Sequence, residues 1–442
     1  MRVILNGDYE VKALLGSPQK STLSYRTMKY CVLDKIENNT LIFNQLTKEL
    51  ILVDNLTDDF WKSDEAISHW CSVPVDFDEK TLVDDLRTKL RNRPIISKEI
   101  NLYHIFTTTN CNARCHYCFE KGNQTCGSMS LDVADRVAEY ILKHQPSDEI
   151  ITLAWFGGEP LLNTSVIDRI CEYLSQRDCR FDSIMATNAF LLTPQIIQKA
   201  KEIWRMDTWN ITLDGTEDVY NSTKNYVKVN GSPFVRVLDN ISLLLESGFN
   251  VNIRMNLGVH NSDDLMSLIN VLHERFGIRE NLCVYCSPLY ERQMEESLRR
   301  TDAEETIVRT KEAELYSKLV SMGYFDLRLR QKLRVYRCNP DMGWAVSVLP
   351  DGRIGWCEDY VDKAIISHID SDTFDENVIN QFKVQCKELP ECAKCILYPD
   401  CIRLQKCNID TPWCTIQKRD LMLFKLKMDI RREYERYVES KS

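Results

Sequence analysis

Several features are missing from this sequence of 442 residues, and each absence excludes a class of protein. No stretch approaches the roughly 18 consecutive apolar residues that a membrane span requires. The N-terminal stretch MRVILNGDYEVKALLG lacks the charged start and continuous apolar segment of a secretion signal. There is no internal repeat, no low-complexity segment and no basic cluster, and the formal net charge is −9. We therefore expect a cytoplasmic protein without membrane or nucleic-acid partners.

Cysteine, in contrast, is abundant, with 18 residues in the chain. Because disulfides are rare in the reducing cytoplasm, this number of cysteines points to metal or redox chemistry. The length predicts two or three domains rather than one.

Residues 1–95 are predicted to form a small α+β unit. The run YCVLDKIENNTLIFNQLTKELILVD alternates apolar and polar residues about turn signals at Asn38-Asn39 and Gln45–Lys48, as successive antiparallel strands do. A helix capped by Thr57 and another over 79–91 would follow.

Residues 96–325 alternate strand patterns with amphipathic helices, which predicts an α/β fold with a parallel sheet. Six strands favour a partial (β/α)6 barrel of the TIM type, with its chemistry on the loops at the C-terminal ends of the strands. The predicted strands are Leu102–Thr107, Ile151–Phe156, Ser183–Ala186, Trp209–Leu213, Val251–Met255 and Cys283–Ser287, and the predicted helices span 131–144, 164–176, 193–203, 235–247 and 262–275. Residues 326–442 hold a cysteine-rich segment with little periodicity and then helical spacing over 415–439.

A cysteine triplet follows the first predicted strand of this barrel. In TTTNCNARCHYCFEKG, Cys111, Cys115 and Cys118 have C-x3-C-x2-C spacing. Three thiolates in one short loop can hold three irons of a four-iron cubane and leave the fourth iron open for a substrate. A zinc site remains an alternative, with His116 as its fourth ligand.

With Tyr117 before the last cysteine, the triplet resembles the C-x3-C-x-aromatic-C signature of the radical S-adenosylmethionine (SAM) superfamily. The resemblance implies that the open iron of a [4Fe–4S] cluster chelates the amine and carboxylate of SAM. An electron from the cluster would then cleave the sulfur–C5′ bond, and the resulting 5′-deoxyadenosyl radical would abstract hydrogen.

A second match follows the second strand, where Phe156-Gly157-Gly158-Glu159-Pro160 resembles the GGEP motif of this superfamily. Glycines permit close approach to the backbone, and the Glu159 carboxylate would receive the SAM ammonium. The alternative is a strand–helix turn with Pro160 near the helix start. The other predicted cofactor-binding residues, which could instead merely pair with neighbours, are Tyr117, Thr187, Asn188, Asp214 and Arg254; Ala189 stands where the family usually has glycine.

The C-terminal cysteines form a second pattern. Thirteen residues separate Cys338 from Gly352 and four more lead to Cys357, before Cys392-x2-Cys395-x5-Cys401-x5-Cys407 and finally Cys414. This resembles the SPASM extension of radical SAM enzymes, which carries two auxiliary [4Fe–4S] clusters. The resemblance implies one cluster on Cys392, Cys395, Cys401 and Cys414, and another on Cys338, Cys357 and Cys407. The second would have an open iron or recruit a further ligand such as Cys386, and two zinc ions are the alternative for the whole segment.

The leading functional hypothesis is an oxidoreductase that matures a ribosomally synthesised precursor peptide by forming a thioether or carbon–carbon crosslink. SPASM regions accompany peptide and protein substrates in this superfamily. Residues 1–95 resemble the winged-helix-like leader-recognition modules of such maturases, whose short three-stranded sheet could bind the leader as an added strand. The implied partners are a precursor peptide and a low-potential electron donor such as flavodoxin or ferredoxin.

Two other functions stay open. Anaerobic sulfatase maturases, which produce formylglycine, place an aspartate proton acceptor directly after the second SPASM cysteine. Glu358 occupies that position here and Asp359 follows, so both are candidate catalytic residues or plain structural carboxylates. A redox sensor without catalysis would keep the cysteines, but the intact GGEP motif argues against it.

Overall fold

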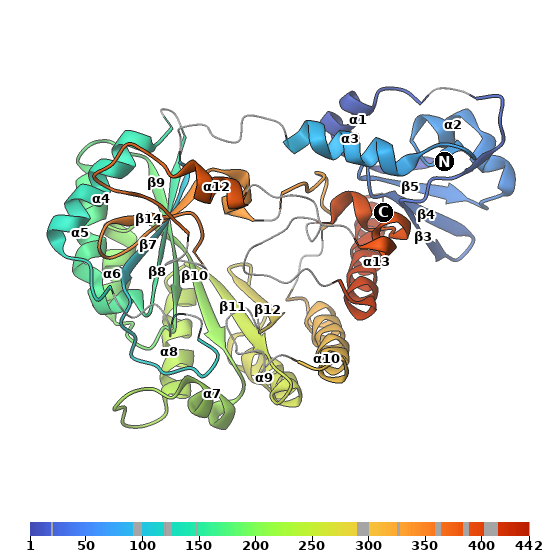
Figure 1. The fold of residues 1–442 in the computed structure, drawn as a ribbon. Helices are drawn as coiled ribbons and strands as arrows, with labels where there is room; N and C mark the ends of the chain where they lie inside the picture. The colour runs from blue at the N-terminus through green and yellow to red at the C-terminus, as the bar shows by residue number, and fades with distance from the viewer. Residues whose placement is uncertain are drawn as a thin grey trace.

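The structure is a computed structural model of the chain (Figure 1). It describes residues 1–18, 21–91, 100–118, 120, 126–146, 149–289, 300–324, 328–336, 338–358, 364–382, 389–401 and 414–441. Cys386, Cys407 and the candidate catalytic residue Asp359 lie outside the described residues. No helix in the described ranges is long and apolar enough to cross a membrane.

A nine-stranded sheet dominates the central part of the chain, with the order β12-β11-β10-β9-β8-β7-β13-β14-β15. Each of the strands β7 to β12 pairs in parallel with its sequence neighbour. The predicted α/β class and the parallel sheet of six strands are therefore confirmed. These strands are β7 (Leu102–Thr108), β8 (Ile151–Gly157), β9 (Phe181–Thr187), β10 (Met206–Leu213), β11 (Asn250–Leu257) and β12 (Leu282–Pro288).

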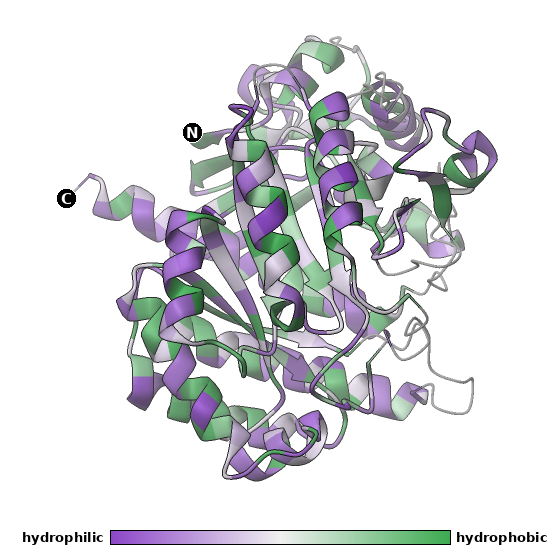
Figure 2. Ribbon diagram, turned by 90° about the vertical axis from the view of Figure 1, so that its left-hand side faces the viewer, coloured by the Kyte–Doolittle hydropathy of each residue, from purple (hydrophilic) through white to green (hydrophobic). Residues whose placement is uncertain are grey.

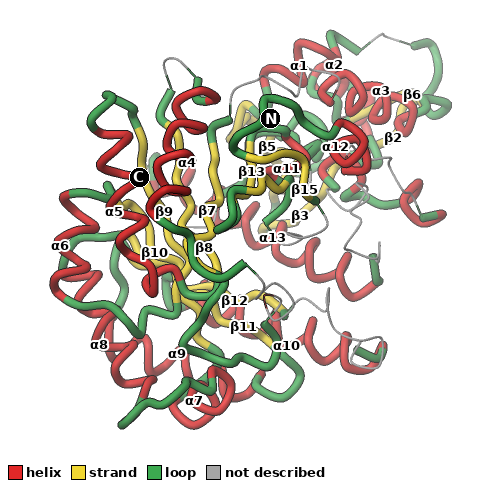
Figure 3. The backbone as a smooth tube through the Cα atoms, turned by 60° about the vertical axis from the view of Figure 1, so that its left-hand side comes forward, coloured by secondary structure: helices red, strands yellow, loops and turns green. Residues whose placement is uncertain are grey.

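Helices connect the parallel strands and cover one side of the sheet (Figures 1 and 3). Figure 2 shows them banded in hydrophobic and hydrophilic residues, and their apolar faces join the strands in the largest hydrophobic core. Ser130, Thr193 and Ser232 cap the first turns of α4, α6 and α8, which fixes where these helices begin. The five predicted helices are present as α4 (Leu131–His144), α5 (Thr164–Ser175), α6 (Pro194–Glu202), α8 (Pro233–Glu246) and α9 (Ser262–Phe276), while α7 (Glu217–Lys224) and α10 (Asp302–Ser321) were not predicted.

The N-terminal part is α+β, as predicted, but its main sheet has four strands rather than three. The order is β1-β5-β4-β3, and all neighbours are antiparallel. Its strands are β1 (Arg2–Asn6), β3 (Cys31–Ile36), β4 (Asn39–Asn44) and β5 (Glu49–Asp54); β2 (Tyr25–Thr27) pairs with β6 (Ser72–Pro74), and the helices are α1 (Tyr9–Leu15), the 3-10 helix η1 (Asp58–Lys62), α2 (Asp64–Ser68) and α3 (Glu79–Arg91).

The C-terminal part of the chain contacts both the central sheet and the N-terminal unit. Strand β13 pairs in parallel with β7, and β14 and β15 extend the sheet by antiparallel pairing. The elements of this part are α11 (Asn339–Met342), β13 (Ala345–Val348), β14 (Arg353–Gly355), β15 (Ile365–His368), α12 (Glu376–Phe382), the 3-10 helices η5 (Pro390–Lys394) and η6 (Tyr398–Asp400), and α13 (Ile416–Glu439). In the central part of the chain, the 3-10 helix η3 (Pro160–Asn163) follows β8.

Both faces of the N-terminal sheet are covered. Leu333, Val335 and Tyr398 complete the core that one face forms with α1, α2 and α3. The other face packs against α13 through Ile430, and Arg431 of α13 forms an ion pair with Asp34 of β3 at 2.6 Å. Figure 1 shows α13 beside β3 and β4. The N-terminal unit therefore shares its cores with the C-terminal part of the chain.

Candidate active site

The cysteine triplet lies directly after β7, at the C-terminal end of the parallel strands. Two backbone hydrogen bonds tie its loop to the end of α7, from Arg114 N to Lys224 O at 2.8 Å and from Val227 N to Asn112 O at 2.9 Å. Asn225, between these anchors, adopts a left-handed conformation that ends the helix. The three thiols are thereby presented by a loop that is held at both its start and its middle.

The thiol groups of the triplet are half-buried and interact with one another. Burial raises the pKa of Cys111 to about 11, and the neighbouring Cys115 and Cys118 thiols add to the increase. The amide of Ala113 donates a hydrogen bond to Cys111 Sγ at 3.4 Å, which favours a thiolate. Three soft thiolates on one loop are the donor set that an iron–sulfur cluster uses.

Among the residues that the structure describes, no group of three or more His, Cys, Asp or Glu side chains is arranged to hold a single metal ion. A cubane spreads its thiolates over separate irons, so the triplet does not have to converge on one point to hold a cluster.

The two glycines of the GGEP motif bring the loop after β8 against the loop after β7. Gly158 N donates to Thr108 O at 3.0 Å, and Glu159 N donates to Asn110 O at 2.9 Å. A Cβ on Gly157 would lie 2.2 Å from Thr108 O, and one on Gly158 would lie 2.3 Å from Asn110 O. Gly157 also has a φ of 124°. Only glycine permits this backbone approach, which fixes the segment that leads into Cys111.

Glu159 is buried, with 1% of its surface exposed, and its carboxylate links two strand ends. It accepts hydrogen bonds from Thr187 Oγ1 at 2.7 Å, from Asn188 N at 2.9 Å and from Leu161 N at 3.2 Å. Burial raises the pKa of Glu159, and these hydrogen bonds offset part of that increase. Pro160 opens the 3-10 helix η3, so the turn of the alternative interpretation is also present.

The segment after β9 contacts the cysteine loop directly. Asn188 Nδ2 donates to Asn112 Oδ1 at 2.7 Å, and Ala189 has a φ of 59°. The left-handed conformation of Ala189 explains why glycine is usual at this position in the family that the sequence resembles, because alanine is strained there.

Tyr117 and Asp214 belong to one buried polar cluster beneath the triplet. The Tyr117 hydroxyl donates to Asp214 Oδ1 at 2.7 Å, and Asn256 Nδ2 donates to the same oxygen at 2.9 Å. Lys224 Nζ lies 3.1 Å from Asp214 Oδ2 and donates to Thr212 Oγ1 at 2.6 Å. Burial, the largest single effect, would lower the pKa of Lys224, but Asp214, Tyr117 and Cys115 together outweigh it and raise this pKa well above the usual range.

Lys224 and Asn256 of this cluster were not predicted from the sequence. A lysine in the last turn of a helix is an ordinary surface pattern, and only the tertiary structure places this one against a buried carboxylate. Arg254 lies on β11 in register with Thr212 and Tyr285, so the three side chains point to the same side of the sheet.

The C-terminal cysteines fall into one group that the structure brings together and one that it does not. The pKa of Cys414 is raised by burial and further by Cys401, Cys395 and Cys392, so these four thiols lie within electrostatic range of one another. Cys395 N donates to Cys392 O at 3.0 Å within η5. These four residues fit the donor set of one cluster.

Of the second predicted set, Cys338 is exposed and Cys357 is buried, and Cys407 lies outside the described residues. Glu358 lies near His104 of β7 and weakly opposes the lowering of its pKa, which burial causes. The carboxylate that follows Cys357 is thus within electrostatic range of β7.

Residues 105–272, from β7 into α9, match the family model described as the radical SAM superfamily. The chain is 32% identical over 122 residues to the uncharacterized protein MJ0907 of Methanocaldococcus jannaschii, which covers 27% of this chain and 41% of that protein. It is 26% identical over 159 residues to the radical SAM cyclopropyl synthase TigE of Paramaledivibacter caminithermalis, which covers 31% of this chain and 33% of that protein. The chain thus spans less than half the length of either relative.

Two solved structures have a similar fold. Native anSMEcpe with bound AdoMet superimposes with a TM-score of 0.60 at 17% identity over 76% of this chain and 98% of that chain. Streptococcus suis SuiB bound to the precursor peptide SuiA gives a TM-score of 0.52 at 12% identity over 86% of this chain and 95% of that chain. Residues 105–272, which include the cysteine triplet and the GGEP motif, are thus similar to the radical SAM superfamily, and this similarity supports SAM and a [4Fe–4S] cluster as cofactors.

Proposed function

We propose that this protein is a radical SAM maturase that crosslinks a ribosomally synthesised precursor peptide. In this proposal, residues 1–95 read the leader, residues 96–325 form the radical SAM partial barrel, and residues 326–442 form the SPASM domain. When bound at Cys111, Cys115 and Cys118, the cluster and SAM supply the radical that abstracts hydrogen. The residues around them then have separate tasks.

The protein side of the SAM site is built from the two loops described above. Glu159, Thr187 and Asn188 hold the ends of β8 and β9 together, and Gly157 and Gly158 let the loop after β8 pack against the segment that leads into Cys111. The Tyr117–Asp214–Lys224 cluster supports the triplet from below. Arg254 faces the same side of the sheet and would contact cofactor or substrate, while Glu358 and Asp359 are the proposed acid–base groups.

The observation that carries the peptide assignment is the edge of the N-terminal sheet. Because both faces of this sheet are covered, an extended peptide can reach it only at an edge. Among the described strands, two form the edges of this sheet: β1 pairs with β5 alone, and β3 pairs with β4 alone. A leader could add to β3 through main-chain hydrogen bonds, which suit a peptide whose modified residues lie far from its anchor.

The similarity to SuiB supports this proposal. That protein was solved with a precursor peptide, and the match covers 86% of this chain against 76% for anSMEcpe. We further propose two auxiliary [4Fe–4S] clusters, one on Cys392, Cys395, Cys401 and Cys414, the other on Cys338, Cys357 and Cys407. Flavodoxin or ferredoxin would supply the electron. The sulfatase-maturase alternative is not favoured.

The test is a proline at the outer edge of β3. In the two-residue hairpin that joins β3 to β4, Ile36 and Asn39 close the turn, so the N–H groups of Leu33 and Lys35 point away from β4. Lys35→Pro removes one outward donor, and Lys35→Ala is the matched control. Reconstituted variants are mixed anaerobically with SAM, dithionite and candidate precursor peptides.

We expect the two variants to form equal amounts of 5′-deoxyadenosine, whereas Lys35→Pro should bind and modify the precursor up to about tenfold less well, the effect of losing one hydrogen bond. Equal peptide modification by both variants would remove the leader-binding role from β3. If no variant forms deoxyadenosine, including the unmodified protein, the radical function itself is wrong.

A further inference from the structure

The hydroxyl group of Tyr30 is buried and has no hydrogen-bond partner among the described residues. Tyr30 directly precedes β3 and is 0% exposed, in the core of the N-terminal unit against which Cys392, Cys395 and Cys401 pack. A buried polar group without a partner is costly, and most such groups in folded proteins are paired. The hydroxyl therefore points to an acceptor that the described part of the chain does not supply.

Tyr30 is held close to the 3-10 helix η5, which leads into Cys395. The ring of Tyr30 stacks on that of Tyr398, with centroids 6.3 Å apart and an interplanar angle of 21°. The amide of Tyr398 donates to Cys395 O at 3.1 Å. Lys29 Nζ lies 4.9 Å from the centroid of the Tyr30 ring and donates to Ala393 O, within η5, at 2.5 Å. Lys29 and Tyr398 thus join the Tyr30 ring to the backbone on both sides of Cys395 in the chain.

The Tyr30 hydroxyl also lies within electrostatic range of the Cys395 thiol. Burial raises the pKa of Tyr30, and nearby carboxylates and this thiol raise it further, so the hydroxyl keeps its proton and can donate. None of the three carboxylates accepts from Tyr30, and each is engaged by another donor: Glu79 by Arg26 at 2.8 Å, Asp84 by Tyr398 at 2.5 Å and Asp78 by Thr81 at 2.7 Å. The other acidic neighbour is sulfur.

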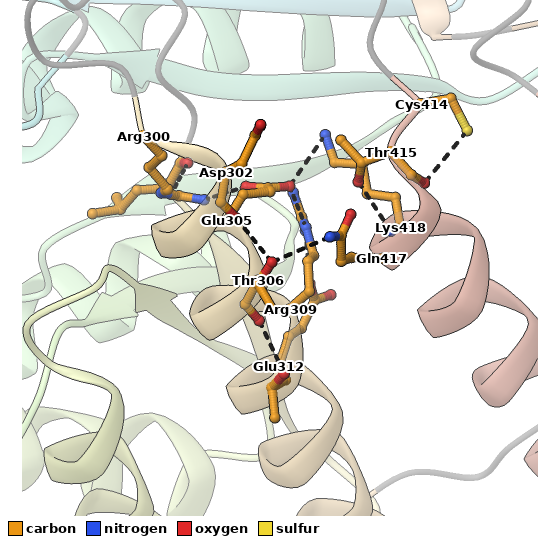
Figure 4. A network of polar contacts seen from close by, with 12 residues as sticks. Arg300, Asp302, Glu305, Thr306, Arg309, Glu312, Cys414, Thr415, Gln417 and Lys418 are labelled. Carbon is orange, nitrogen blue, oxygen red and sulfur yellow. Dashed lines mark hydrogen bonds and ion pairs between the residues drawn. The ribbon is translucent and has the colours of Figure 1, made fainter.

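The last cysteine of this group is held elsewhere, at the start of α13 (Figure 4). Cys414 precedes Thr415, the N-cap of α13, whose hydroxyl accepts a hydrogen bond from Lys418 N at 3.2 Å. Lys418 Nζ lies 3.7 Å from Glu305 Oε1 of α10, and both side chains are buried. The N-terminal unit and α10 therefore hold different members of one group of thiols.

We infer that the Tyr30 hydroxyl donates a hydrogen bond to a sulfur atom of the auxiliary cluster held by Cys392, Cys395, Cys401 and Cys414. A donor to cluster sulfur stabilises the more negative, reduced form and so raises the reduction potential. Tyr30 is then a positioning residue through which the N-terminal unit sets the potential of this cluster. The inference rests on the auxiliary cluster of the proposed function.

Tyr30→Phe removes only the hydroxyl, and its effect can be measured in the reconstituted full-length enzyme by redox titration with electron paramagnetic resonance. The signal that is lost in both Cys401→Ala and Cys414→Ala identifies the cluster concerned. Tyr30→Phe should lower the midpoint potential of this signal and leave the other signals unchanged. The expected change is up to about tenfold in the equilibrium constant for reduction, or about 59 mV for one electron.

Tyr324→Phe is the matched control. The Tyr324 hydroxyl is likewise buried without a hydrogen-bond partner among the described residues, but burial is the sole cause of its raised pKa, with no thiol in range. Tyr324→Phe should therefore change no midpoint potential. An unchanged or raised potential in Tyr30→Phe, or an equal shift in Tyr324→Phe, would overturn the inference.

Iron content provides the second measurement. The Tyr30 hydroxyl bonds to no described residue, so its removal breaks no such hydrogen bond. Loss of this cluster from Tyr30→Phe but not from Tyr324→Phe would therefore also support the contact with the cluster, whereas equal loss from both would contradict it. Should Cys401→Ala and Cys414→Ala remove no common signal, the auxiliary assignment fails together with this inference, while the leader-binding test remains valid.

Discussion

The two cysteine-bearing regions of this protein are held in different ways. Backbone hydrogen bonds fix the triplet loop, which contacts the GGEP loop and the end of α7 with few side-chain intermediaries. The Cys392–Cys401 segment and Cys414 are instead held by side chains from distant parts of the chain, including Arg87 of α3 and Glu305 of α10.

The difference separates what a local motif specifies from what the assembled molecule specifies. A loop held by glycines and main-chain contacts needs only its own residues and the strands beside it. The C-terminal cysteines need the N-terminal unit and α10 to be in place. We therefore expect substitutions at the first site to abolish SAM chemistry, and substitutions around the second to lower cluster content while SAM chemistry persists.

The largest effect is expected from replacing Cys111, Cys115 and Cys118 together by alanine. Anaerobic reconstitution of the unmodified protein should give about twelve irons per chain, four for each cluster. The variant should lose about a third of that iron and all formation of 5′-deoxyadenosine, measured by iron assay and chromatography. Iron content that does not change would show that the triplet holds no cluster.

The next largest effect is expected at Gly158. In Gly158→Ala the new Cβ would meet Asn110 O and Thr109 O, at 2.3 and 2.7 Å, and both are backbone atoms that cannot turn aside. The two loops should separate, at a cost of about 3 kcal/mol in unfolding free energy, with loss of SAM binding.

Gly258→Ala is the control for this substitution. Its Cβ would have Asn261 Oδ1 and Leu289 Cδ1 as neighbours, at 3.5 and 3.6 Å, which are ordinary contact distances. Calorimetry of SAM binding by both variants distinguishes the two sites, and equal affinities would contradict the role assigned to the GGEP loop.

A smaller and more selective effect should follow from Arg87→Met. Arg87 is buried, and its guanidinium donates to Pro399 O at 2.6 Å and to Cys401 O at 3.4 Å. Its loss leaves two carbonyl groups without these charged donors, which costs on the order of 1.5–3 kcal/mol. Iron content should fall by up to a third while deoxyadenosine formation persists.

Arg26→Met provides the comparison for Arg87, because Arg26 donates to Val75 O and Phe77 O within the N-terminal unit itself. This variant should keep its full complement of iron. If both variants lost iron equally, general destabilisation of the N-terminal unit rather than the contact with the cysteine segment would be the cause.

The same contrast explains how far the sequence could be interpreted. The parallel strands and five of the helices were predictable because their apolar periodicity and caps are local signals, as at Ser130 and Thr193. The cysteine triplet and the GGEP motif could also be recognised, because each lies within a short stretch of sequence. The family match over residues 105–272 supports the superfamily that they indicated.

Contacts between distant segments could not be predicted. Nothing near Lys224 in the sequence indicates that it is buried beside Asp214, and the pairing of β13 with β7 joins residues far apart in the chain. The four-stranded N-terminal sheet was also missed, because β1 precedes the alternating run and pairs with β5 at its end. Such contacts depend on tertiary packing, which a single sequence does not display.

The smallest predicted effect concerns Asp429, on the part of α13 that contacts α10. Burial raises the pKa of Asp429 to about 6, although the Tyr316 hydroxyl, which donates to Oδ1 at 3.3 Å, opposes the increase. A carboxyl group whose pKa is higher in the folded than in the unfolded state stabilises the fold below its unfolded value of 3.8. This contribution is lost as the pH rises through 6.

Asp429→Asn removes this titration and keeps an oxygen that can accept from Tyr316. The variant should gain stability relative to the unmodified protein between pH 4.5 and about 7, by on the order of 1 kcal/mol after allowance for solvent screening. Urea denaturation midpoints at several pH values measure the difference. Asp420→Asn, at an exposed position of the same helix, should show no such trend. If the difference in unfolding free energy between Asp429→Asn and the unmodified protein does not change with pH, burial does not raise the pKa of Asp429. Water would then reach the contact between α13 and α10.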